Sequence, residues 1–135
     1  MNATPLFTPR HDRHGFTLIE LLVVVVVIGI VAAIGVPKFA NSKTKGYITA
    51  MKSDLRNLIN AEEQFFSDSA RYTNNLASLG FKMTAGVNAP SITVLPGAWK
   101  ATVTHSQLSS VQCAIGVNTT NPLWAGAGEG EAACK

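Results

Sequence analysis

Gly15-Phe16-Thr17-Leu18-Ile19-Glu20 opens the stretch that decides the fold, and an uncharged apolar run, Leu21 to Val36, follows it directly. The run contains five consecutive valines and stops at Pro37, and Glu20 is the single ionisable side chain between Phe16 and that proline. At 1.5 Å per residue, about 22 helical residues reach roughly 33 Å, which is enough to cross the hydrocarbon core of a membrane. The alternative is a buried strand of valines, but strands rarely exceed about ten residues. The length therefore favours a membrane-spanning helix.

Glu20 is the exception within this stretch. A carboxylate near the end of a membrane helix costs a few kcal/mol, so its presence points to a partner. Either Glu20 lies at the membrane surface and stays hydrated, or it pairs with a positive charge that is embedded in apolar surroundings in an assembled state.

The same residues resemble the type III signal of type IV pilins. The match comprises the Gly15-Phe16 junction, Glu20, the basic leader before them and the apolar helix after them, as far as Pro37-Lys38-Phe39. In that family a membrane aspartyl protease, the prepilin peptidase, cleaves after the glycine and methylates the new N-terminus. The resemblance implies cleavage between Gly15 and Phe16, an N-methyl group on Phe16, and a Glu20 that pairs with the N-terminal amine of a neighbouring subunit. A wrongly registered subunit would leave both charges uncompensated, at a cost of several kcal/mol.

The sequence predicts three parts: a cleaved leader over residues 1–15, a transmembrane and assembly helix over 16–39, and one globular domain over 40–135. The leader is unlike an ordinary secretory signal, because its cleavage site precedes the apolar run, so that the run survives processing. The residues after the run are too few for two globular domains. A net charge of +3 without a basic aromatic patch gives no reason to expect direct nucleic-acid binding.

Helical periodicity resumes after Pro37 and predicts one amphipathic helix from about Phe39 to Ser67. Its apolar positions recur every three or four residues, with charged residues between them: Ile48, Met51, Leu55, Leu58, Ile59, Phe65 and Phe66 against Lys52, Asp54, Arg56, Glu62 and Glu63. Joined to the membrane segment, this gives one helix of about 50 residues, roughly 75 Å long.

Turn formers over 68–75 and a short apolar piece over 76–81 correspond to the αβ loop of the family. Alternating segments then predict antiparallel strands at Ser91–Leu95, Trp99–His105 and Val111–Val117, with a weaker fourth strand near Leu123–Ala125. The expected fold is α+β: a long N-terminal helix spine, membrane-spanning in its first half, packed on a small antiparallel sheet, which is the ladle architecture of pilins.

Gly29, Gly35 and Pro37 interrupt the regularity of the apolar helix. A proline within a helix removes one hydrogen bond, so a bend or local melting is expected there. Close packing of helices at small residues is the simpler interpretation. The resemblance implies that Gly29 and Pro37 bracket a segment that loosens when subunits assemble.

Cys113 and Cys134 are the only cysteines. In a translocated domain they enter an oxidising compartment, where such a pair closes into a disulfide worth roughly 3 kcal/mol. Two free thiols are the alternative. Family members often close their C-terminal region in this way.

No metal site, cofactor or catalytic centre is predicted. His11 and His14 lie in the leader and His105 stands alone, so no cluster has ligand spacing and no enzyme is expected. Glu129 and Glu131 are too few for a calcium loop, and Asn118-Thr119-Thr120 is better explained as a turn than as a glycosylation site. Five aromatic residues are expected in core or subunit contacts, not in a charge-conducting stack: Phe65, Phe66, Tyr72, Trp99 and Trp124.

The resemblance implies a structural subunit of a type IV pilus, held in the bacterial inner membrane as a precursor and then polymerised with copies of itself into an extracellular filament (fimbrium). Its expected partners are the prepilin peptidase, the inner-membrane assembly machinery and, before assembly, membrane lipid. Adhesion, motility or DNA uptake would follow. The alternatives are a pseudopilin of a type II secretion system, a minor pilin, and a monomeric membrane-anchored binding domain; Glu20, without a partner in a lone subunit, argues against the last.

Overall fold

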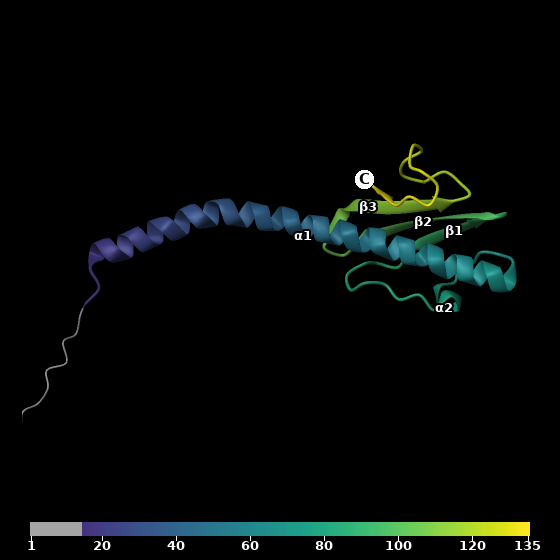
Figure 1. Ribbon diagram of the computed structural model, residues 1–135, viewed down its shortest axis with the longest axis horizontal. Helices are drawn as coiled ribbons and strands as arrows, with labels where there is room; N and C mark the ends of the chain where they lie inside the picture. The colour runs from purple at the N-terminus through teal and green to yellow at the C-terminus, as the bar shows by residue number, and fades with distance from the viewer. Residues whose placement is uncertain (1–14) are drawn as a thin grey trace, which may run out of the picture. The chain divides into compact units, whose positions relative to one another are not determined.

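The computed structural model describes residues 15–135 (Figure 1). In chain order the elements are α1 (Leu18–Ser69), α2 (Leu76–Leu79), β1 (Ser91–Leu95), β2 (Ala98–His105), β3 (Leu108–Val117) and β4 (Ala133–Cys134). The chain divides into two compact units, the first ending at Lys38 and the second spanning Phe39–Lys135. The predicted α+β class, with a long N-terminal helix and a small antiparallel sheet, is confirmed. The leader lies outside the described residues except for Gly15.

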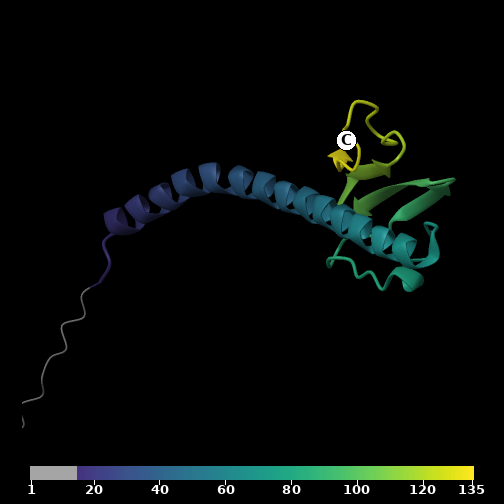
Figure 2. The same ribbon diagram turned by 45° about the vertical axis from the view of Figure 1, so that its right-hand side comes forward.

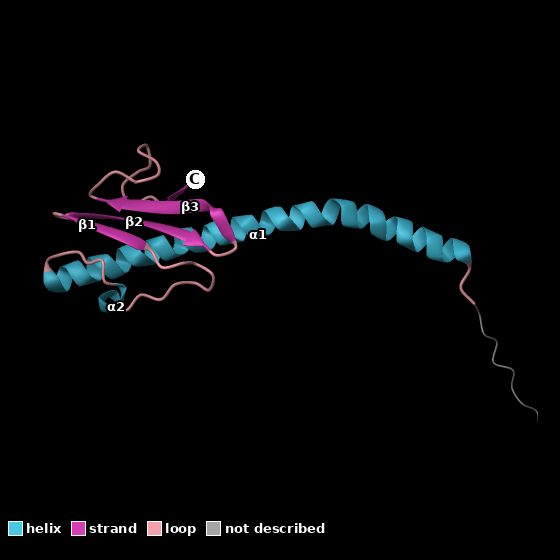
Figure 3. Cartoon of the chain, turned by 180° about the vertical axis from the view of Figure 1, so that it is seen from behind, coloured by secondary structure: helices cyan, strands magenta, loops and turns pink. Residues whose placement is uncertain are grey.

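The second unit is built around a stripe on the later part of α1. Met51, Leu55 and Leu58 recur every three or four residues, so they share one face of the helix, and each is at most 1% exposed. Burying a side chain of this kind contributes about 1.5–3 kcal/mol. In Figure 3 strands β1, β2 and β3 lie along this part of α1. The stripe packs there against the inward side chains of β2 and β3: Trp99, Ala101, Val103, Cys113, Ile115 and Val117.

The sheet has the order β1-β2-β3-β4, and every neighbouring pair is antiparallel. Alternation along β2 buries Trp99 and Val103 on the helix side and leaves Lys100 and Thr102 half-buried on the other. The turn between β1 and β2 places Gly97 at φ 68°, a backbone conformation that suits glycine. Tight pairing of strands close in sequence therefore builds most of the sheet.

The predicted strand at Leu123–Ala125 is wrong, and the fourth strand is β4. Leu123 and Trp124 donate their backbone N–H groups to Oδ1 of Asn121, at 2.9 and 3.3 Å, and so turn away from the sheet. β4 pairs with β3 through Cys113 and Cys134. Figure 2 shows the C-terminal segment in yellow beside β3.

α1 continues two residues beyond its predicted end at Ser67. It stops where Ala70 adopts φ 53° and donates its N–H to the carbonyl of Phe66 at 2.7 Å. α2 occupies the predicted apolar piece after the turn, and Asn75 caps it by accepting a hydrogen bond from the Ala77 N–H at 3.1 Å. The first helix therefore ends two residues later than its periodicity predicts, whereas α2 begins at the predicted residue.

Candidate processing and assembly site

The start of α1 is a reciprocal capping box between Thr17 and Glu20. The Thr17 N–H and hydroxyl donate to Oε2 of Glu20 at 2.9 and 2.7 Å, and the Glu20 N–H donates to the Thr17 hydroxyl at 3.3 Å. A threonine followed three residues later by glutamate forms this arrangement because each side chain satisfies a backbone donor at the other residue. Gly15 and Phe16 precede the cap and are exposed. The junction at which cleavage is predicted thus lies outside regular structure, one residue before the cap.

The capping box shows that the expectation of an unpartnered Glu20 in a lone subunit is wrong. A lone subunit does provide a partner for Glu20, because Thr17 holds its carboxylate. The lack of a partner therefore cannot be used against a monomeric membrane-anchored protein. The pairing of Glu20 with the amine of a neighbour stays a prediction.

The apolar side chains between Phe16 and Phe39 project outward. Their exposed fractions run from 48% at Val24 to 88% at Leu18. The apolar part of α1 has a mean hydropathy of 3.0 and is long enough to cross a membrane. No residue of this apolar window is buried by the rest of its own helix, so apart from Glu20 the helix presents an apolar surface in every direction.

α1 runs through Gly29, Gly35 and Pro37 without a break. The local melting considered for this segment is therefore not found in the single subunit. A Cβ atom added at Gly29 or Gly35 would meet nothing within 4 Å, which leaves both positions open to close approach by another helix. Loosening of this segment on assembly stays a prediction.

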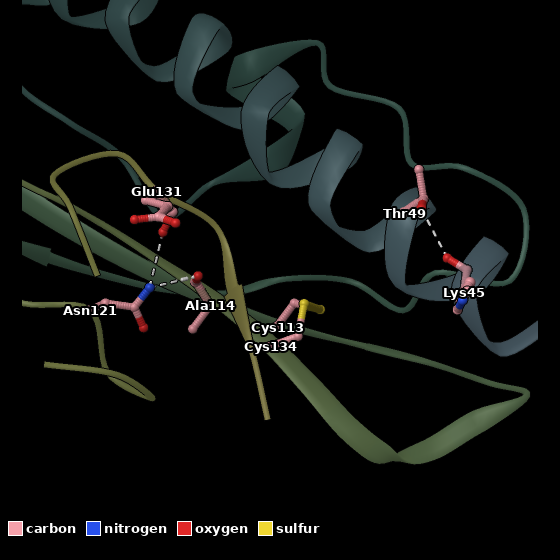
Figure 4. The surroundings of a disulfide bond; sticks show 7 residues. All are labelled: Lys45, Thr49, Cys113, Ala114, Asn121, Glu131 and Cys134. Carbon is pink, nitrogen blue, oxygen red and sulfur yellow. Dashed lines mark hydrogen bonds between the residues drawn. A yellow bond between two sulfur atoms is a disulfide. The ribbon is translucent and has the colours of Figure 1, made fainter. Parts of the chain in front are cut away.

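A disulfide joins Cys113 to Cys134 and closes the C-terminal region (Figure 4). Inside the closed loop Asn121 is buried, and its Nδ2 donates to the carbonyls of Ala114 at 2.8 Å and Glu131 at 3.1 Å. The same side chain accepts the two N–H groups after it, as described above. Asn121 therefore organises this loop, and its role was missed because its four partners lie on three separate segments.

Three acidic side chains of α1 hold the αβ loop. Asp54 accepts the N–H and the hydroxyl of Thr84, both at 2.8 Å. Glu62 accepts the Thr73 N–H at 3.1 Å, and Glu63 accepts the Tyr72 hydroxyl at 2.9 Å.

The sequence pattern placed Asp54 and Glu62 on the polar side of the helix, and this is wrong. Both are buried, at 3% and 0% exposed. They lie four residues on either side of Leu58, so they share its face. Burial raises the pKa of Glu62 above its ordinary value of 4.5, the Thr73 N–H opposes this, and the neighbouring charge of Glu63 adds to it. Burial likewise raises the pKa of Tyr72 above 10.0, with the hydrogen bond to Glu63 acting in the same direction.

The remaining singled-out polar residues have structural roles in the described part of the chain. His105 is buried, stacks on Tyr47 with ring centroids 4.2 Å apart, and accepts the Gln107 N–H on Nδ1. Glu129 accepts the Asn118 N–H, and Glu131 accepts the Gly128 N–H. Among residues 15–135 no group of three His, Cys, Asp or Glu side chains is arranged to hold a metal ion; His11 and His14 lie outside those residues.

The aromatic residues divide into core and surface. Trp99 and Tyr72 are buried, and Phe66 stacks on Tyr72 with centroids 4.6 Å apart. Phe65 is half-buried, whereas Trp124 is 57% exposed. Asn118 lies at φ 54° and donates its Nδ2 to the carbonyl of Gly97, as a turn residue does.

The sequence of this N-terminal segment matches a known family model. Residues 10–36 match the model of the prokaryotic N-terminal methylation motif. The chain has the prepilin signal of the type IV pilin family. The predicted resemblance is thereby confirmed.

Several relatives share a longer stretch. The chain is 40% identical over 80 residues to the type IV major pilin protein PilA of Myxococcus xanthus, covering 59% of this chain and 36% of that protein. It is 37% identical over 76 residues to the type IV wide pilus major component PilA4 of Thermus thermophilus, covering 54% and 58%. It is 34% identical over 70 residues to the type II secretion system core protein G of Pseudomonas aeruginosa, covering 52% and 49%. The chain therefore spans between about a third and three fifths of the length of these relatives.

Proposed function

We propose that the chain is a structural subunit of a type IV pilus, made as an inner-membrane precursor and polymerised through its N-terminal helix into a surface filament. The observation that carries this is the exposed apolar helix that forms most of the methylation motif, residues 10–36. An apolar surface of this size is stable in lipid or against copies of itself, and not in water. The apolar surface is kept away from water both before assembly, when the helix lies in lipid, and after assembly, when it lies in a bundle of identical helices. The relatives named as major pilins support the same function.

In this function the prepilin peptidase cleaves between Gly15 and Phe16 and methylates Phe16. Cleavage leaves the Thr17–Glu20 capping box intact, because both of its members lie in the mature chain. It also creates a cationic amine at Phe16. Glu20 then offers its carboxylate to the amine of an adjacent subunit, and a subunit in the wrong register leaves the two charges unpaired. Thr17 holds the carboxylate in place until that partner arrives.

Gly29 and Pro37 are assigned to loosening of the helix during assembly, and Cys113 and Cys134 to closing the exposed C-terminal region. The proposed partners are copies of the chain, the peptidase, the inner-membrane assembly machinery and lipid. Adhesion, motility or DNA uptake would depend on the machinery that extends and retracts the filament.

A pseudopilin of a type II secretion system is the second candidate. The specific observation in its favour is that several relatives, at 34–36% identity, are named type II secretion system core protein G. A minor pilin shares the same signal and helix.

Intact-mass spectrometry of filaments sheared from the cell surface tests the proposal. The expected species is residues 16–135 with one added methyl group and two hydrogens fewer for the disulfide. The same processed mass confined to the membrane or periplasmic fraction would favour the pseudopilin or minor pilin. A chain that keeps residues 1–15 would overturn the assembly function.

A further inference from the structure

Strands β1 and β2 carry a group of polar side chains on the face of the sheet that is turned away from α1. Thr93 lies directly opposite Lys100, and Ser91 lies directly opposite Thr102. Side chains opposite each other in an antiparallel pair have Cβ atoms about 4.5–5.5 Å apart, and every second residue of a strand faces the same way. Lys100 and Thr102 alternate with core residues of β2, so the four side chains stand together on the opposite face. They are called the outer cluster below.

The outer cluster lines a small hollow on the sheet. Its four residues, with Ala101 and Pro122, line a cavity of about 70 Å³. Pockets for drug-sized ligands measure about 300–1,000 Å³, so this one accepts only a group of a few heavy atoms. Pro122 follows Asn121, whose Nδ2 donates to the Ala114 carbonyl of β3 at 2.8 Å. The C-terminal loop therefore holds one wall of the hollow in place against the sheet.

The polar groups of the outer cluster are not used by the fold. Within residues 15–135 none of its four side chains has a hydrogen-bond or ion-pair partner. Serine and threonine directly opposite each other in a sheet often share a hydrogen bond, and this pair does not. Two other threonines show the contrast: the Thr84 hydroxyl donates to Asp54 at 2.8 Å, and the Thr104 hydroxyl accepts from Nδ2 of Asn88 at 2.9 Å. The outer cluster is therefore available to a ligand.

The chemistry of the hollow suits an anion with several oxygen atoms. It presents one ammonium group and three hydroxyl groups, and none of the described residues that line it is acidic. An ammonium group has three donors and no acceptor, and each hydroxyl adds one donor. A metal ion would be repelled by the lysine, and an uncharged ligand would leave the ammonium charge unmatched. Hydrogen bonds from a charged donor to an anionic oxygen are about twice as strong as neutral ones.

We propose that the outer cluster binds a tetrahedral oxyanion, a phosphate or sulfate group, with the Lys100 ammonium as its counter-charge and the three hydroxyl groups as donors to its oxygens. The group is either a free anion or the ester end of a larger molecule, since both present the same oxygens. Because the hollow is open to water and holds one cation, the affinity is expected in the millimolar range and falls as the salt concentration rises. The inference goes beyond the proposed pilus function and does not depend on it, because the whole outer cluster lies within one subunit.

An NMR titration of the full-length protein with inorganic phosphate tests the proposal. The protein is solubilised in an uncharged detergent, and sodium chloride keeps the ionic strength constant. The amide signals of residues 91–93 and 100–102 are expected to shift and saturate, whereas that of Thr44, on α1, stays unchanged. K100Q is expected to lower the affinity about tenfold, because it removes the charged donor. The matched control K82Q removes one lysine charge at an exposed position outside the hollow and should bind phosphate like the wild type.

A second variant separates the hollow from simple attraction to a lysine. T93V/T102V removes two hydroxyl groups and keeps the branched shape of both side chains, so the strands are expected to form as before. The thermal midpoint without phosphate checks this. The variant is expected to bind phosphate severalfold more weakly than the wild type, although Lys100 is still present.

Methyl phosphate, an ester, distinguishes the two sources of the group. Binding of both compounds supports a site for the end of a larger molecule, and binding of inorganic phosphate alone supports a site for the free anion. The site is overturned if the signals of the wild type do not saturate, if K82Q weakens binding as much as K100Q, or if T93V/T102V binds like the wild type. None of these results bears on the pilus function, which the mass of the sheared filaments decides.

Discussion

Removing the disulfide between Cys113 and Cys134 has an effect on stability that can be worked out from the fold. The bond spans 21 residues, and in the chain-entropy model a loop of that size destabilises the unfolded chain by about 3 kcal/mol. The double variant C113A/C134A should therefore lower the free energy of unfolding by about that amount. Cys113 is fully buried, so its truncation adds a core term of about 1 kcal/mol.

The assay is urea unfolding of residues 39–135, which form a compact unit with its own core, followed by circular dichroism. The m-value should rise in the variant, because the unfolded chain exposes more surface without the cross-link. Wild-type protein in reductant is the control: it should lose the entropic part alone, about 3 kcal/mol, whereas reductant should leave the variant unchanged. A loss below about 1 kcal/mol in both cases would refute the reasoning, since the loop would then be held in the unfolded chain without its bond.

Three further substitutions test the interior. Burial raises the pKa of Glu62, so the stability that comes from binding its proton is complete below pH 4.5 and is lost as the pH rises through the folded-state pKa. In urea titrations the free energy of unfolding of Glu62→Gln should therefore rise relative to that of the wild type as the pH increases. A difference that stays constant across pH would contradict this. Gly86→Ala should destabilise by about 1–3 kcal/mol, because its Cβ would lie 2.6 Å from Nε2 of His105 at φ 91°. Gly97→Ala, at φ 68° with nothing within 4 Å, is the control and should cost about 1 kcal/mol, so equal losses would show that His105 moves aside. Asn121→Ala should cost about 1–3 kcal/mol by leaving its buried backbone partners unpaired, and hydrogen exchange should rise in the C-terminal loop; unchanged exchange would argue against its organising role.

Helices and strands that follow from the spacing of apolar residues could be predicted from the sequence. Those that depend on hydrogen bonds to residues far away in the chain could not. The apolar run and the spacing of Met51, Leu55 and Leu58 fix α1, and alternation fixes most of β2 and β3. β4 has two residues and is defined by its pairing with β3, a partner about twenty residues away. Leu123–Ala125 has the composition of a strand, but Asn121 takes the hydrogen bonds that a strand would need.

The residues of the candidate site also differ in how far the sequence reveals them. The Gly15-Phe16 junction and Glu20 were predicted as processing and assembly residues because their residue types stand at the start of the apolar helix, and these roles stay predictions. The Thr17–Glu20 capping box was readable from its spacing and was missed. The burial of Asp54 and Glu62 could be suspected from their position around Leu58. The donors that make this burial tolerable, at Thr73 and Thr84, belong to a loop whose path no periodicity describes.

The hydrogen bonds that hold the αβ loop affect which of its residues can be substituted during evolution. Asp54 and Glu62 grip main-chain N–H groups of the loop, and every residue except proline has that group. The loop can therefore exchange nearly all of its outward side chains, and with them whatever they display to the surroundings, while it follows the same path over the helix. Thr73 and Thr84 can change to any residue that keeps a main-chain N–H, although Thr84 also donates its hydroxyl to Asp54 and Tyr72 donates its hydroxyl to Glu63, so these two side chains vary less freely. On the helix, Asp54 and Glu62 must keep a group that accepts these hydrogen bonds.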